Sequence, residues 1–396
     1  MSELSYLEKL LDGAEVEWVA LNKLATFLKG KSLPKEKITP DGNRYCIHYG
    51  ELFTHYGPII DKVCSKTNQA INESILSEKN DVLMPTSDVT PRGLATASCI
   101  QESGVILGGD ILIIRCSGVD GRYLSNFIIN NKKKILQMVK GSTVYHLYAK
   151  DIGKLLIPIP CPNNPEKSLA IQSEIVRILD KFTALTAELT AELNMRKKQY
   201  NYYRDQLLSF KEGEVEWKTL GEVAVIGTGN HDTQDAIEHG KYIFYARGRE
   251  PLKLNVFDFD ETAIITAGDG AGVGKVFHYA KGKYALHQRA YRIVPNAFMN
   301  PRFVYHYITA YFFTYIQKAS VSSSVTSLRR PMFLKFPIPV PPSEEQARIV
   351  EILDKFDTLT NSITEGLPRE IELRQKQYEY YRDLLFSFPK PETVSN

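Results

Sequence analysis

The chain has 396 residues, more than one ordinary domain holds, so its length predicts two or three domains. Hydrophobic residues make up 43% and charged residues 24% of the sequence, which is typical of a globular protein and argues against long disordered, collagen-like and membrane classes. A net charge of +3 is compatible with an anionic partner but does not by itself indicate one.

The cysteines and the N-terminal sequence bear on the compartment in which the chain works. The five cysteines include no C-x-x-C pair, a pattern that fits reduced thiols better than disulfides or a zinc site. Residues 1–11 lack the basic and apolar regions of a signal peptide, and no apolar run approaches the roughly 18 residues of a membrane span. We therefore expect a cytoplasmic protein with no membrane contact and no metal site.

The first stretch of the chain, residues 18–158, contains short strand-like runs separated by glycine and polar clusters. Asp81–Met84 and Asp110–Ile114 contain apolar runs of this kind, and residues 121–140 form a weaker helical pattern. Such a mixture predicts an α+β domain with polar loops on one rim.

A long helix is predicted to follow, from Ile171 to Phe210. Its apolar residues recur three and four positions apart, as in the seam of paired helices; they are residues 171, 175, 178, 182, 185 and 189. An extra step of four at Leu193 shifts the register, as a stutter does in a coiled coil. A helix of this length spans ~60 Å, and its single apolar stripe requires a partner.

The next stretch, residues 217–337, again alternates strand-like runs with polar clusters. Ala263–Ile265 and Tyr291–Val294 are examples of such runs, and Pro301–Gln317 is a helical pattern that closes the stretch. We expect a second α+β domain here.

A second long helical pattern covers residues 349–388. Gly366 and Pro368 lie in the middle of this pattern. Since proline removes a backbone donor and glycine weakens a helix, we expect them to kink or break the second helix.

The two helical stretches are near copies of one another. Residues 349–356 match residues 175–182 at seven of eight positions, and residues 377–388 match residues 199–210 at nine of twelve. The domains repeat only at their edges, with Glu-Val-Glu-Trp at the start and Pro-Ile-Pro at the end. The connectivity then predicts two antiparallel helices with pseudo-two-fold symmetry and a domain at each end. The alternative is that each helix packs only on its own domain.

A symmetric frame that holds two unlike loop surfaces favours a ligand with two separated parts. Duplex DNA read at two half-sites has this property, because protein geometry sets the distance between half-sites. The tandem Thr186–Leu189 and Thr190–Leu193 is one Thr-Ala-Glu-Leu unit duplicated. Four helical residues add ~6 Å, comparable with two base-pair steps of ~3.4 Å each, so helix length is a candidate ruler.

Several motifs together resemble the specificity subunits of type I restriction-modification enzymes, over nearly the whole chain. They are Pro-Ile-Pro at 158–160 and 337–339, Ser-Glu-Glu-Gln at 343–346, both Ile-Leu-Asp-Lys-Phe cores, both Tyr-Tyr-Arg-Asp endings, the glycine-rich Ile264–Phe277 and its counterpart Asp81–Asp88. The first copy departs from the pattern, because Leu169–Gln172 stands in place of Ser-Glu-Glu-Gln. The start of the first helix is therefore undecided.

The resemblance implies a fold and a division of the chain. Two α/β target recognition domains would be joined by two long antiparallel α-helices that form a coiled coil, an α+β architecture with a pseudo-two-fold repeat. The N-terminal recognition domain would cover residues 1–165, the central helix 166–212, the C-terminal recognition domain 213–343, and the distal helix with its tail 344–396.

The resemblance also implies a function and partners. Each recognition domain would read half of a bipartite sequence in double-stranded DNA, while the helices would dock two methyltransferase subunits and, for cleavage, restriction subunits with motor and nuclease activity. The chain would act in DNA methylation and restriction without being catalytic and would hold no cofactor, since S-adenosylmethionine, ATP and Mg would be bound by partner subunits. The alternatives are a coiled-coil scaffold with two protein- or glycan-binding domains, and a self-sufficient methyltransferase.

The sequence does not match two motifs that would indicate catalysis, the phosphate loop and the adenine methyltransferase motif. The glycine cluster Gly268–Lys275 is no phosphate loop, because Asp269 occupies the opening glycine position and Val276 replaces the Ser or Thr that binds magnesium. The Asn/Asp-Pro-Pro-Tyr/Phe stretch expected of an adenine methyltransferase is missing from the sequence. Catalysis is therefore expected from partners, and the glycine cluster is expected to be a tight turn near DNA or a strand connection.

Base reading requires Arg, Lys, Asn, Gln, Ser or Thr on loops that reach groove edges, with basic or hydroxyl side chains on the phosphates. The DNA-binding candidates in domain one are Thr86, Ser87, Arg92, Lys132, Lys133, Lys134 and Lys140. Those in domain two are Arg247, Arg249, His287, Gln288 and Arg289, with Ser322, Ser323, Ser324, Arg329 and Arg330 as backbone contacts. Each of them alone is also compatible with a solvated surface, and a lone histidine such as His287 is more often structural.

Both long helices end in tyrosine-rich segments, which exceed what one helix seam needs. The partner-binding candidates are Tyr200, Tyr203, Tyr378 and Tyr381, with Tyr202 and Tyr380 beside them. The near-identity of the two segments predicts two copies of one partner, whereas packing between the helices is the alternative.

Overall fold

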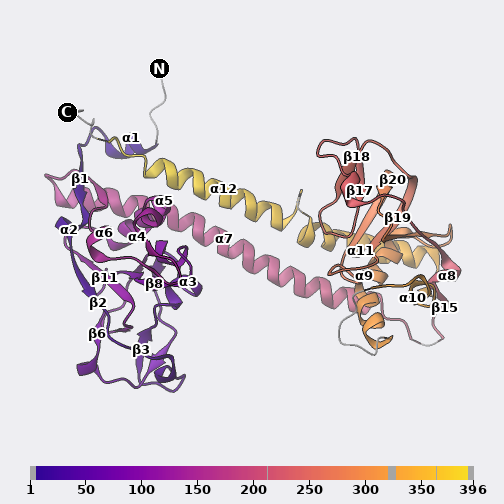
Figure 1. Cartoon of the computed structure of the whole chain (residues 1–396), viewed down its shortest axis with the longest axis horizontal. Coiled ribbons are helices and arrows are strands. Elements are labelled where there is room, and N and C mark those ends of the chain that lie inside the picture. Colours follow the sequence, from indigo (N-terminus) through magenta and orange to yellow (C-terminus); the bar gives the residue numbers. More distant parts are fainter. Residues whose placement is uncertain (1–5, 212, 320–326, 363, 391–396) are drawn as a thin grey trace. The chain divides into compact units, whose positions relative to one another are not determined.

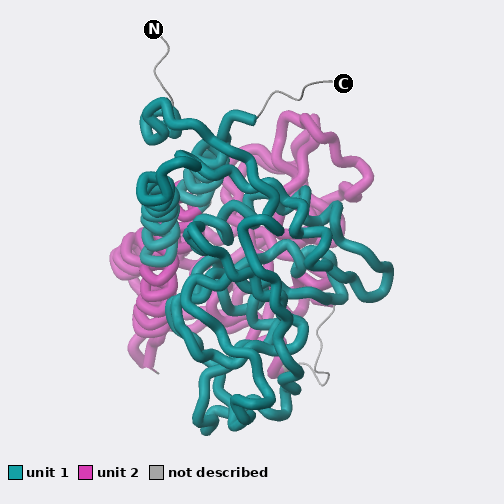
Figure 2. The backbone as a smooth tube through the Cα atoms, turned by 90° about the vertical axis from the view of Figure 1, so that its left-hand side faces the viewer, with its two compact units in different colours: residues 1–188, 372–396 teal, residues 189–371 magenta. Residues whose placement is uncertain are grey.

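The computed structural model describes residues 6–211, 213–319, 327–362 and 364–390. The chain forms two compact units, and the first of them joins two segments that lie far apart in the sequence (Figure 2). Unit 1 comprises residues 1–188 and 372–396, and unit 2 comprises residues 189–371. Each unit therefore contains one globular domain, the beginning of one long helical segment and the end of the other (Figure 1).

The domain of unit 1 is built from several small sheets. In sheet order, the strands are β2 (Ala25–Lys29), β11 (Ile111–Cys116), β7 (Val82–Pro85), β9 (Ser98–Ile100) and β4 (Ile59–Ile60); β5 (Lys66–Thr67), β3 (Arg44–Ile47), β10 (Ile106–Leu107) and β6 (Ile75–Leu76); β12 (Lys140–Gly141), β13 (Tyr145–His146) and β8 (Ser87–Asp88); and β1 (Val16–Ala20) with β14 (Leu156–Pro160). The strand-like runs at 81–84 and 110–114 are confirmed as β7 and β11.

The domain of unit 1 also contains short helices. They are α1 (Tyr6–Leu11), α2 (Leu21–Leu24), α3 (Glu51–Thr54), α4 (Gly121–Asn130), α5 (Lys132–Met138) and α6 (Ala149–Ile152). The helical pattern at 121–140 is two helices that meet at Asn131. The largest core cluster joins α1, α4, the start of the first long helix and the C-terminal Phe386 and Phe388.

The domain of unit 2 is built around one larger sheet. Its strand order is β16 (Ala224–Thr228), β21 (Ala290–Pro295), β19 (Phe259–Ala267), β20 (Phe277–Leu286), β17 (Tyr242–Tyr245) and β18 (Leu252–Leu254), and a separate pair joins β15 (Glu216–Thr219) to β22 (Pro337–Val340). The helices are α8 (Leu220–Val223), α9 (Pro301–Ala319), α10 (Arg330–Leu334) and α11 (Ser343–Asn361). The strand-like runs at 263–265 and 291–294 and the helix at 301–317 are confirmed in β19, β21 and α9.

The first long helix, α7, spans Pro165–Leu207 and 43 residues, so it begins earlier and ends sooner than its apolar pattern predicts. Proline suits the first helical position, where its missing N–H costs nothing. The side chain of Asn164 accepts the backbone N–H of Lys167 at 3.0 Å and caps the helix. The start that the sequence leaves undecided is thus set by Asn164 and Pro165.

The second long pattern is broken, as predicted. α11 ends at Asn361, and α12 spans Leu367–Leu385. Gly366 lies between them with φ +81°, a left-handed conformation that favours glycine.

Within each unit the helical segments pair through equivalent aromatic contacts. In unit 1, Phe182 stacks on Tyr381 with ring centroids 5.2 Å apart, and in unit 2, Phe356 stacks on Tyr203 at 5.6 Å. The repeat relates these pairs, because Phe356 follows Phe182 by 356 − 182 = 174 positions and Tyr381 follows Tyr203 by 381 − 203 = 178. The alternative in which each helix packs only on its own domain is therefore excluded.

The N- and C-terminal segments of unit 1 show the direction of its helices. Trp18 pairs with Pro158, shortly before α7 begins, and donates its indole N–H to the carbonyl oxygen of Pro389 at 2.7 Å, shortly after α12 ends. The end of α12 therefore lies beside the beginning of α7, so the two segments run antiparallel in this unit (Figure 1).

A buried glutamine near the start of each long helical segment ties that segment to its domain. Gln346 Oε1 accepts the backbone N–H of Asn300 at 2.7 Å, and Gln172 Oε1 accepts the backbone N–H of Asp120 at 2.9 Å. Asn300 and Asp120 immediately precede α9 and α4. Of the four residues Ser-Glu-Glu-Gln, only the glutamine is present in the first repeat. The contact that both glutamines make gives a structural reason why this residue is retained.

Candidate nucleic-acid interface

Three segments of unit 2 bring two arginines and one aspartate together. Arg247 follows β17, Asp269 follows β19, and Arg289 precedes β21. The Asp269 oxygens bind one arginine each, Oδ1 at 2.9 Å from Nη1 of Arg247 and Oδ2 at 3.1 Å from Nη1 of Arg289. Burial by itself raises the pKa of Asp269, but hydrogen bonds from both guanidinium groups outweigh it and hold that pKa below its ordinary value. Asp269 is therefore an ionised bridge between two cations.

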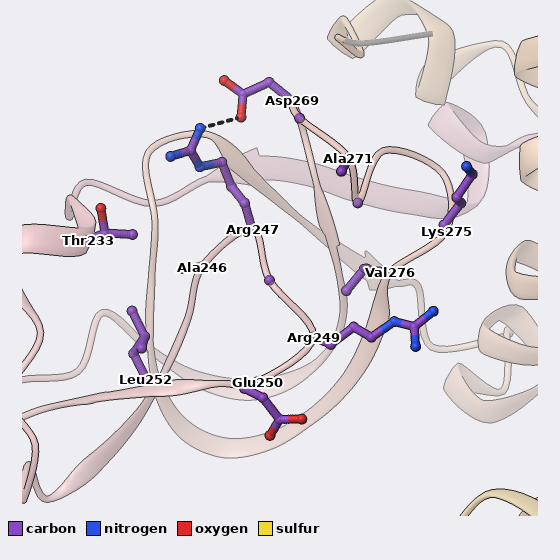
Figure 3. A pocket seen from close by; sticks show the side chains of 13 residues that line it. Thr233, Ala246, Arg247, Arg249, Glu250, Leu252, Asp269, Ala271, Lys275 and Val276 are labelled. Carbon is purple, nitrogen blue, oxygen red and sulfur yellow. Dashed lines mark hydrogen bonds and ion pairs between the residues drawn. The ribbon is translucent and has the colours of Figure 1, made fainter. Parts of the chain in front are cut away.

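A pocket of about 580 Å³ opens beside this bridge (Figure 3). Its charged lining consists of Arg247, Arg249, Glu250, Asp269 and Lys275. Arg249 and Lys275 are exposed, so the pocket presents cationic groups to solvent next to the bridge. Lys275 was not among the DNA-binding candidates proposed from the sequence, although it is the last residue of the glycine cluster Gly268–Lys275.

The glycine cluster Gly268–Lys275 connects two strands rather than a strand and a helix. It runs from the end of β19 to the start of β20, which confirms the predicted strand connection and removes the helix N-terminus that a phosphate loop needs. A Cβ on Gly268 would lie 2.6 Å from the carbonyl oxygen of Arg289, and one on Gly272 would lie 2.7 Å from that of Arg247. The glycines therefore allow the loop to approach the backbone of both arginines.

The structure places His287 in the interior, rather than on the reading surface proposed from the sequence. Its side chain is 1% exposed, and Nδ1 accepts the backbone N–H of Arg289 at 2.9 Å. Burial lowers the pKa of His287, which keeps the ring neutral at neutral pH. His287 thus holds the backbone of Arg289 from the interior of the domain.

The remaining candidates of domain two lie in three places. Gln288 is exposed and donates from Nε2 to Asp232 at 3.0 Å, so it belongs to the same turn as Arg289. Arg329 and Arg330 are exposed at the start of α10. Ser322, Ser323 and Ser324 lie outside the described residues.

The candidates of domain one lie on adjoining elements. Ser87 belongs to β8 and Lys140 to β12, and both strands pair with β13. The short turn η3 (Gly93–Ala95), which follows the exposed Arg92, packs against both β8 and α5. The other candidates are the half-buried Thr86, directly before β8, and the exposed Lys132, Lys133 and Lys134 in the first turn of α5.

One of these lysines already has a partner. Lys140 Nζ lies 3.1 Å from Oδ2 of Asp151, and a hydrogen bond from Lys140 is the largest cause that lowers the pKa of Asp151. Sequence reasoning missed this acidic partner, because the two residues meet only in the folded domain.

The tyrosine candidates combine helix packing with exposure. Tyr203 and Tyr381 stack on phenylalanines of the neighbouring helical segments and remain 45% and 38% exposed. Burial raises the pKa of Tyr200 to about 12, and it raises the pKa of Tyr378 as well. Their neighbours Tyr202 and Tyr380 are the most exposed members of the two segments.

Two other kinds of site are absent from the part of the chain that the structure describes. Within residues 6–211, 213–319, 327–362 and 364–390, no three His, Cys, Asp or Glu residues are grouped as metal ligands, and no helix is both long and apolar enough for a membrane span. The five cysteines are free thiols.

The fold and the polar surfaces together define a two-domain repeat protein in which matching frames carry unlike loop surfaces. Residues 14–196 and 212–373 each match the family described as "Type I restriction modification DNA specificity domain", and the chain belongs to this family.

Relatives and solved structures agree with this assignment. The specificity subunit of the type I restriction enzyme EcoR124I/EcoR124II of Escherichia coli is 41% identical over 100% of both chains, and that of EcoprrI from the same organism is 37% identical over 92% of this chain and 93% of the relative. The crystal structure of a type I restriction-modification S subunit from M. genitalium matches with a TM-score of 0.64 at 17% identity, covering 96% of this chain and 98% of the other, which supports the fold.

Proposed function

We propose that the chain is the DNA-specificity subunit of a type I restriction-modification enzyme and that each domain reads one half of a bipartite site. The observation that carries this proposal is the contrast between frame and surface. Gln172 and Gln346 make the same contact in both units, yet the loops beside them come from sheets of different size and strand order. A repeated frame with unlike surfaces suits two half-sites of different sequence.

The second part of the proposal concerns the partners. Tyr202–Tyr203 and Tyr380–Tyr381 form nearly identical edge-on pairs, with centroids 5.4 and 5.3 Å apart and interplanar angles of 76° and 77°. Two such exposed aromatic pairs at equivalent positions fit two copies of the same protein partner. We assign them to two methyltransferase subunits, with restriction subunits joining for cleavage.

The third part concerns chemistry. The sequence lacks the Asn/Asp-Pro-Pro-Tyr/Phe stretch, so the chain itself is proposed to be non-catalytic and to hold no cofactor. S-adenosylmethionine, ATP and Mg would be bound by the partner subunits.

A domain exchange tests the proposal. Residues 217–337 would be replaced by the corresponding residues of the 41% identical E. coli relative, and methylated adenines would be mapped in cells that also contain the methyltransferase partner. We expect one half of the methylated motif to change and the other half to stay, since the frame contacts are retained. The reciprocal exchange of residues 18–158 is the matched control and should change the other half.

Two results would count against the proposal. If both exchanged chains directed methylation to the same motif as the original chain, the domains would not be the parts that read DNA. Affinity of the full chain for random duplex that does not fall with rising salt would favour the scaffold alternative, because phosphate contacts impose a steep salt dependence.

A further inference from the structure

We infer that Arg289 reads guanine in the half-site recognised by domain two, with Asp269 as the residue that positions it beside Arg247. This inference rests on the proposed function and deepens it, because it names a base and the side chain that selects it.

The backbone of Arg289 is held at both of its polar groups. Its N–H donates to the buried His287 at 2.9 Å, and its carbonyl oxygen accepts the N–H of Gly268 at 2.8 Å. The side chain is nevertheless 64% exposed. Because its backbone is already fixed, the exposed guanidinium loses little conformational entropy on binding. This suits selective recognition rather than non-specific electrostatic attraction.

Asp269 fixes the two guanidinium groups relative to each other. It contacts Nη1 of each arginine, one through Oδ1 and one through Oδ2. A guanidinium has five N–H donors in a rigid planar fork. In the described part of the chain, Nε and Nη2 of Arg289 are therefore left for a ligand, while its orientation is set by the carboxylate.

The charges favour a base edge over a phosphate. At the bridge itself, two arginines and one aspartate carry a net charge of about +1, while the further cations Arg249 and Lys275 lie in the adjoining pocket together with Glu250. A phosphate in contact with the arginines would be repelled by Asp269, whereas a neutral base edge would not. Guanine presents two acceptors, N7 and O6, in the major groove, while adenine presents an acceptor and a donor. A planar donor fork therefore selects guanine.

The first experiment measures discrimination at one base pair. The full chain, assembled with its methyltransferase partner, is titrated with a duplex carrying the mapped methylation motif and with duplexes in which each G·C pair of the domain-two half-site is replaced by A·T. In Arg289→Ala, we expect one of these replacements to lose its effect, a loss of roughly ten- to one-hundredfold in discrimination. Arg289→Lys should restore affinity but not discrimination, because a lysine is a point charge without the fork.

A matched control separates base reading from the loss of one positive charge. Arg348 lies on α11 in the same unit, is exposed and pairs with Glu345. Arg348→Ala should leave discrimination at every position of the motif unchanged. If Arg348→Ala and Arg289→Ala lowered affinity equally for all duplexes, the inference would be overturned.

The second experiment uses Asp269→Asn. A positioning role and a merely structural role of Asp269 predict opposite changes in the affinity for random duplex. The substitution keeps the shape of the side chain and removes its negative charge, so the bridge becomes more cationic while the arginines lose their fixed orientation. We expect affinity for random duplex to rise and discrimination at the guanine to fall. A fall in both would contradict the positioning role.

The results also distinguish failure of the inference from failure of the proposed function. If the domain exchange alters one half-site but that half-site contains only A·T pairs, the function stands and the guanine assignment is wrong. The function likewise stands and the guanine assignment is wrong if the enzyme carrying Arg289→Ala methylates the same motif with the same selectivity. If neither domain exchange alters the motif, the proposed function itself fails.

Discussion

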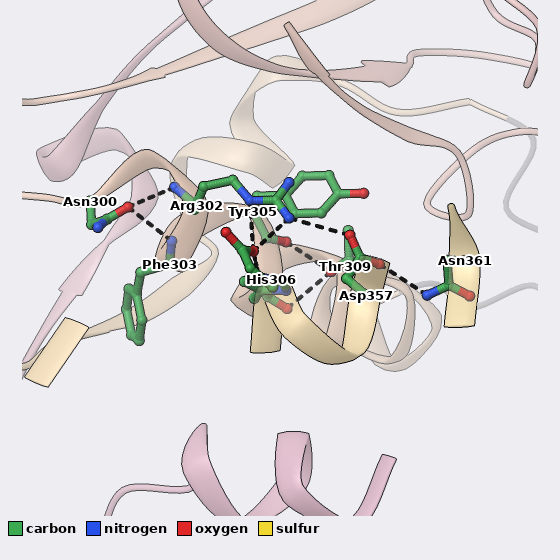
Figure 4. Close-up of polar contacts among 9 residues, drawn as sticks. Asn300, Arg302, Phe303, Tyr305, His306, Thr309, Asp357 and Asn361 are labelled. Atoms are coloured by element: carbon green, nitrogen blue, oxygen red, sulfur yellow. Dashed lines mark hydrogen bonds and ion pairs between the residues drawn. The ribbon is translucent and has the colours of Figure 1, made fainter. Parts of the chain in front are cut away.

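At the scale of single residues, equivalent aspartates of the two repeats have pKa values shifted in opposite directions. Asp354 Oδ1 lies 2.6 Å from Nε2 of His306 and 2.6 Å from Nη2 of Arg302. Arg302 also donates to Oδ2 of Asp357 at 3.3 Å (Figure 4). Burial alone would raise the pKa of Asp354, but the hydrogen bonds from His306 and Arg302 outweigh it and lower that pKa. Burial raises the pKa of Asp180, and the charge of Arg122 opposes it only in part. The repeat therefore conserves the carboxyl group but not its partners.

The Asp354 cluster predicts an acid-dependent contribution to stability. Asp354→Asn is expected to lower the free energy of unfolding by about 1–2 kcal/mol at pH 7, because Arg302 and the buried His306 lose a charged acceptor. Because the folded-state pKa is lowered, this stability is fully present above the ordinary aspartate value of 3.8 and is lost as pH falls through the lowered pKa. The difference between the two proteins should therefore shrink only below about pH 4.

Urea unfolding measures this difference. The chain has two tryptophans, so in a Trp18→Phe background the fluorescence of Trp217 reports on unit 2. Glu351→Gln is the control, because Glu351 lies in the same unit, is 70% exposed, and its pair with Lys355 is worth little. An equal loss in both variants would show that the cluster adds no special stability.

The partners and the burial of single residues could not be predicted from the sequence. Both aspartates were visible as part of the repeated Ile-Leu-Asp-Lys-Phe core, but His306 lies in a domain interior that does not repeat. His287 has the residue type of a base reader, and only folding shows that it is buried. Asp269 counted against a phosphate loop, while its contacts with two arginines required three segments to converge.

At the scale of elements, long periodic patterns are predictable and short strands are not. The apolar spacing predicted α7, and the Gly and Pro in the second pattern predicted the break between α11 and α12. The apolar pattern, which begins at Ile171, leaves the start of α7 undecided, although Asn164 and Pro165 are a recognisable helix start. Strands such as β8 and β12, of two residues each, have too few side chains to show a period and form only because β13 lies between them.

The break between α11 and α12 predicts that Gly366 is intolerant of a side chain. A Cβ at Gly366 would lie 2.4 Å from the carbonyl oxygen of Thr358, in addition to the cost of a left-handed residue. The conformational cost is about 1–2 kcal/mol, so Gly366→Ala should lose more than this in thermal or urea unfolding. Gly282→Ala is the matched control, since Gly282 has φ +85° with no atom within 4 Å of the added Cβ. Equal losses would mean that the backbone at Gly366 shifts freely.

At the scale of the whole molecule, the repeat was the most informative feature of the sequence. Internal copies of a helix and of domain edges predicted a frame used twice, and the family match covers residues 14–196 and 212–373. The bases recognised could not be predicted, because they depend on loops that the two domains do not share. In domain one these loops connect several small sheets, whereas in domain two they connect a six-stranded sheet.

The length of α7 predicts the spacing between the two half-sites. Thr190–Leu193 is the second of two Thr-Ala-Glu-Leu units and lies inside α7, the helix that runs from unit 1 into unit 2. Deleting these four residues removes ~6 Å of helix, so the gap in the methylated motif should shorten by about two base pairs. Both half-site sequences should stay the same, since neither domain is altered.

Methylation mapping of three variants completes this test of the helix as a ruler. Inserting a third Thr-Ala-Glu-Leu unit should lengthen the gap by the same amount that the deletion shortens it. Replacing Thr190–Leu193 with four other helix-forming residues should leave the gap unchanged, because it preserves length while changing sequence. A gap that stays constant while the half-sites change would show that α7 influences the reading domains rather than their spacing.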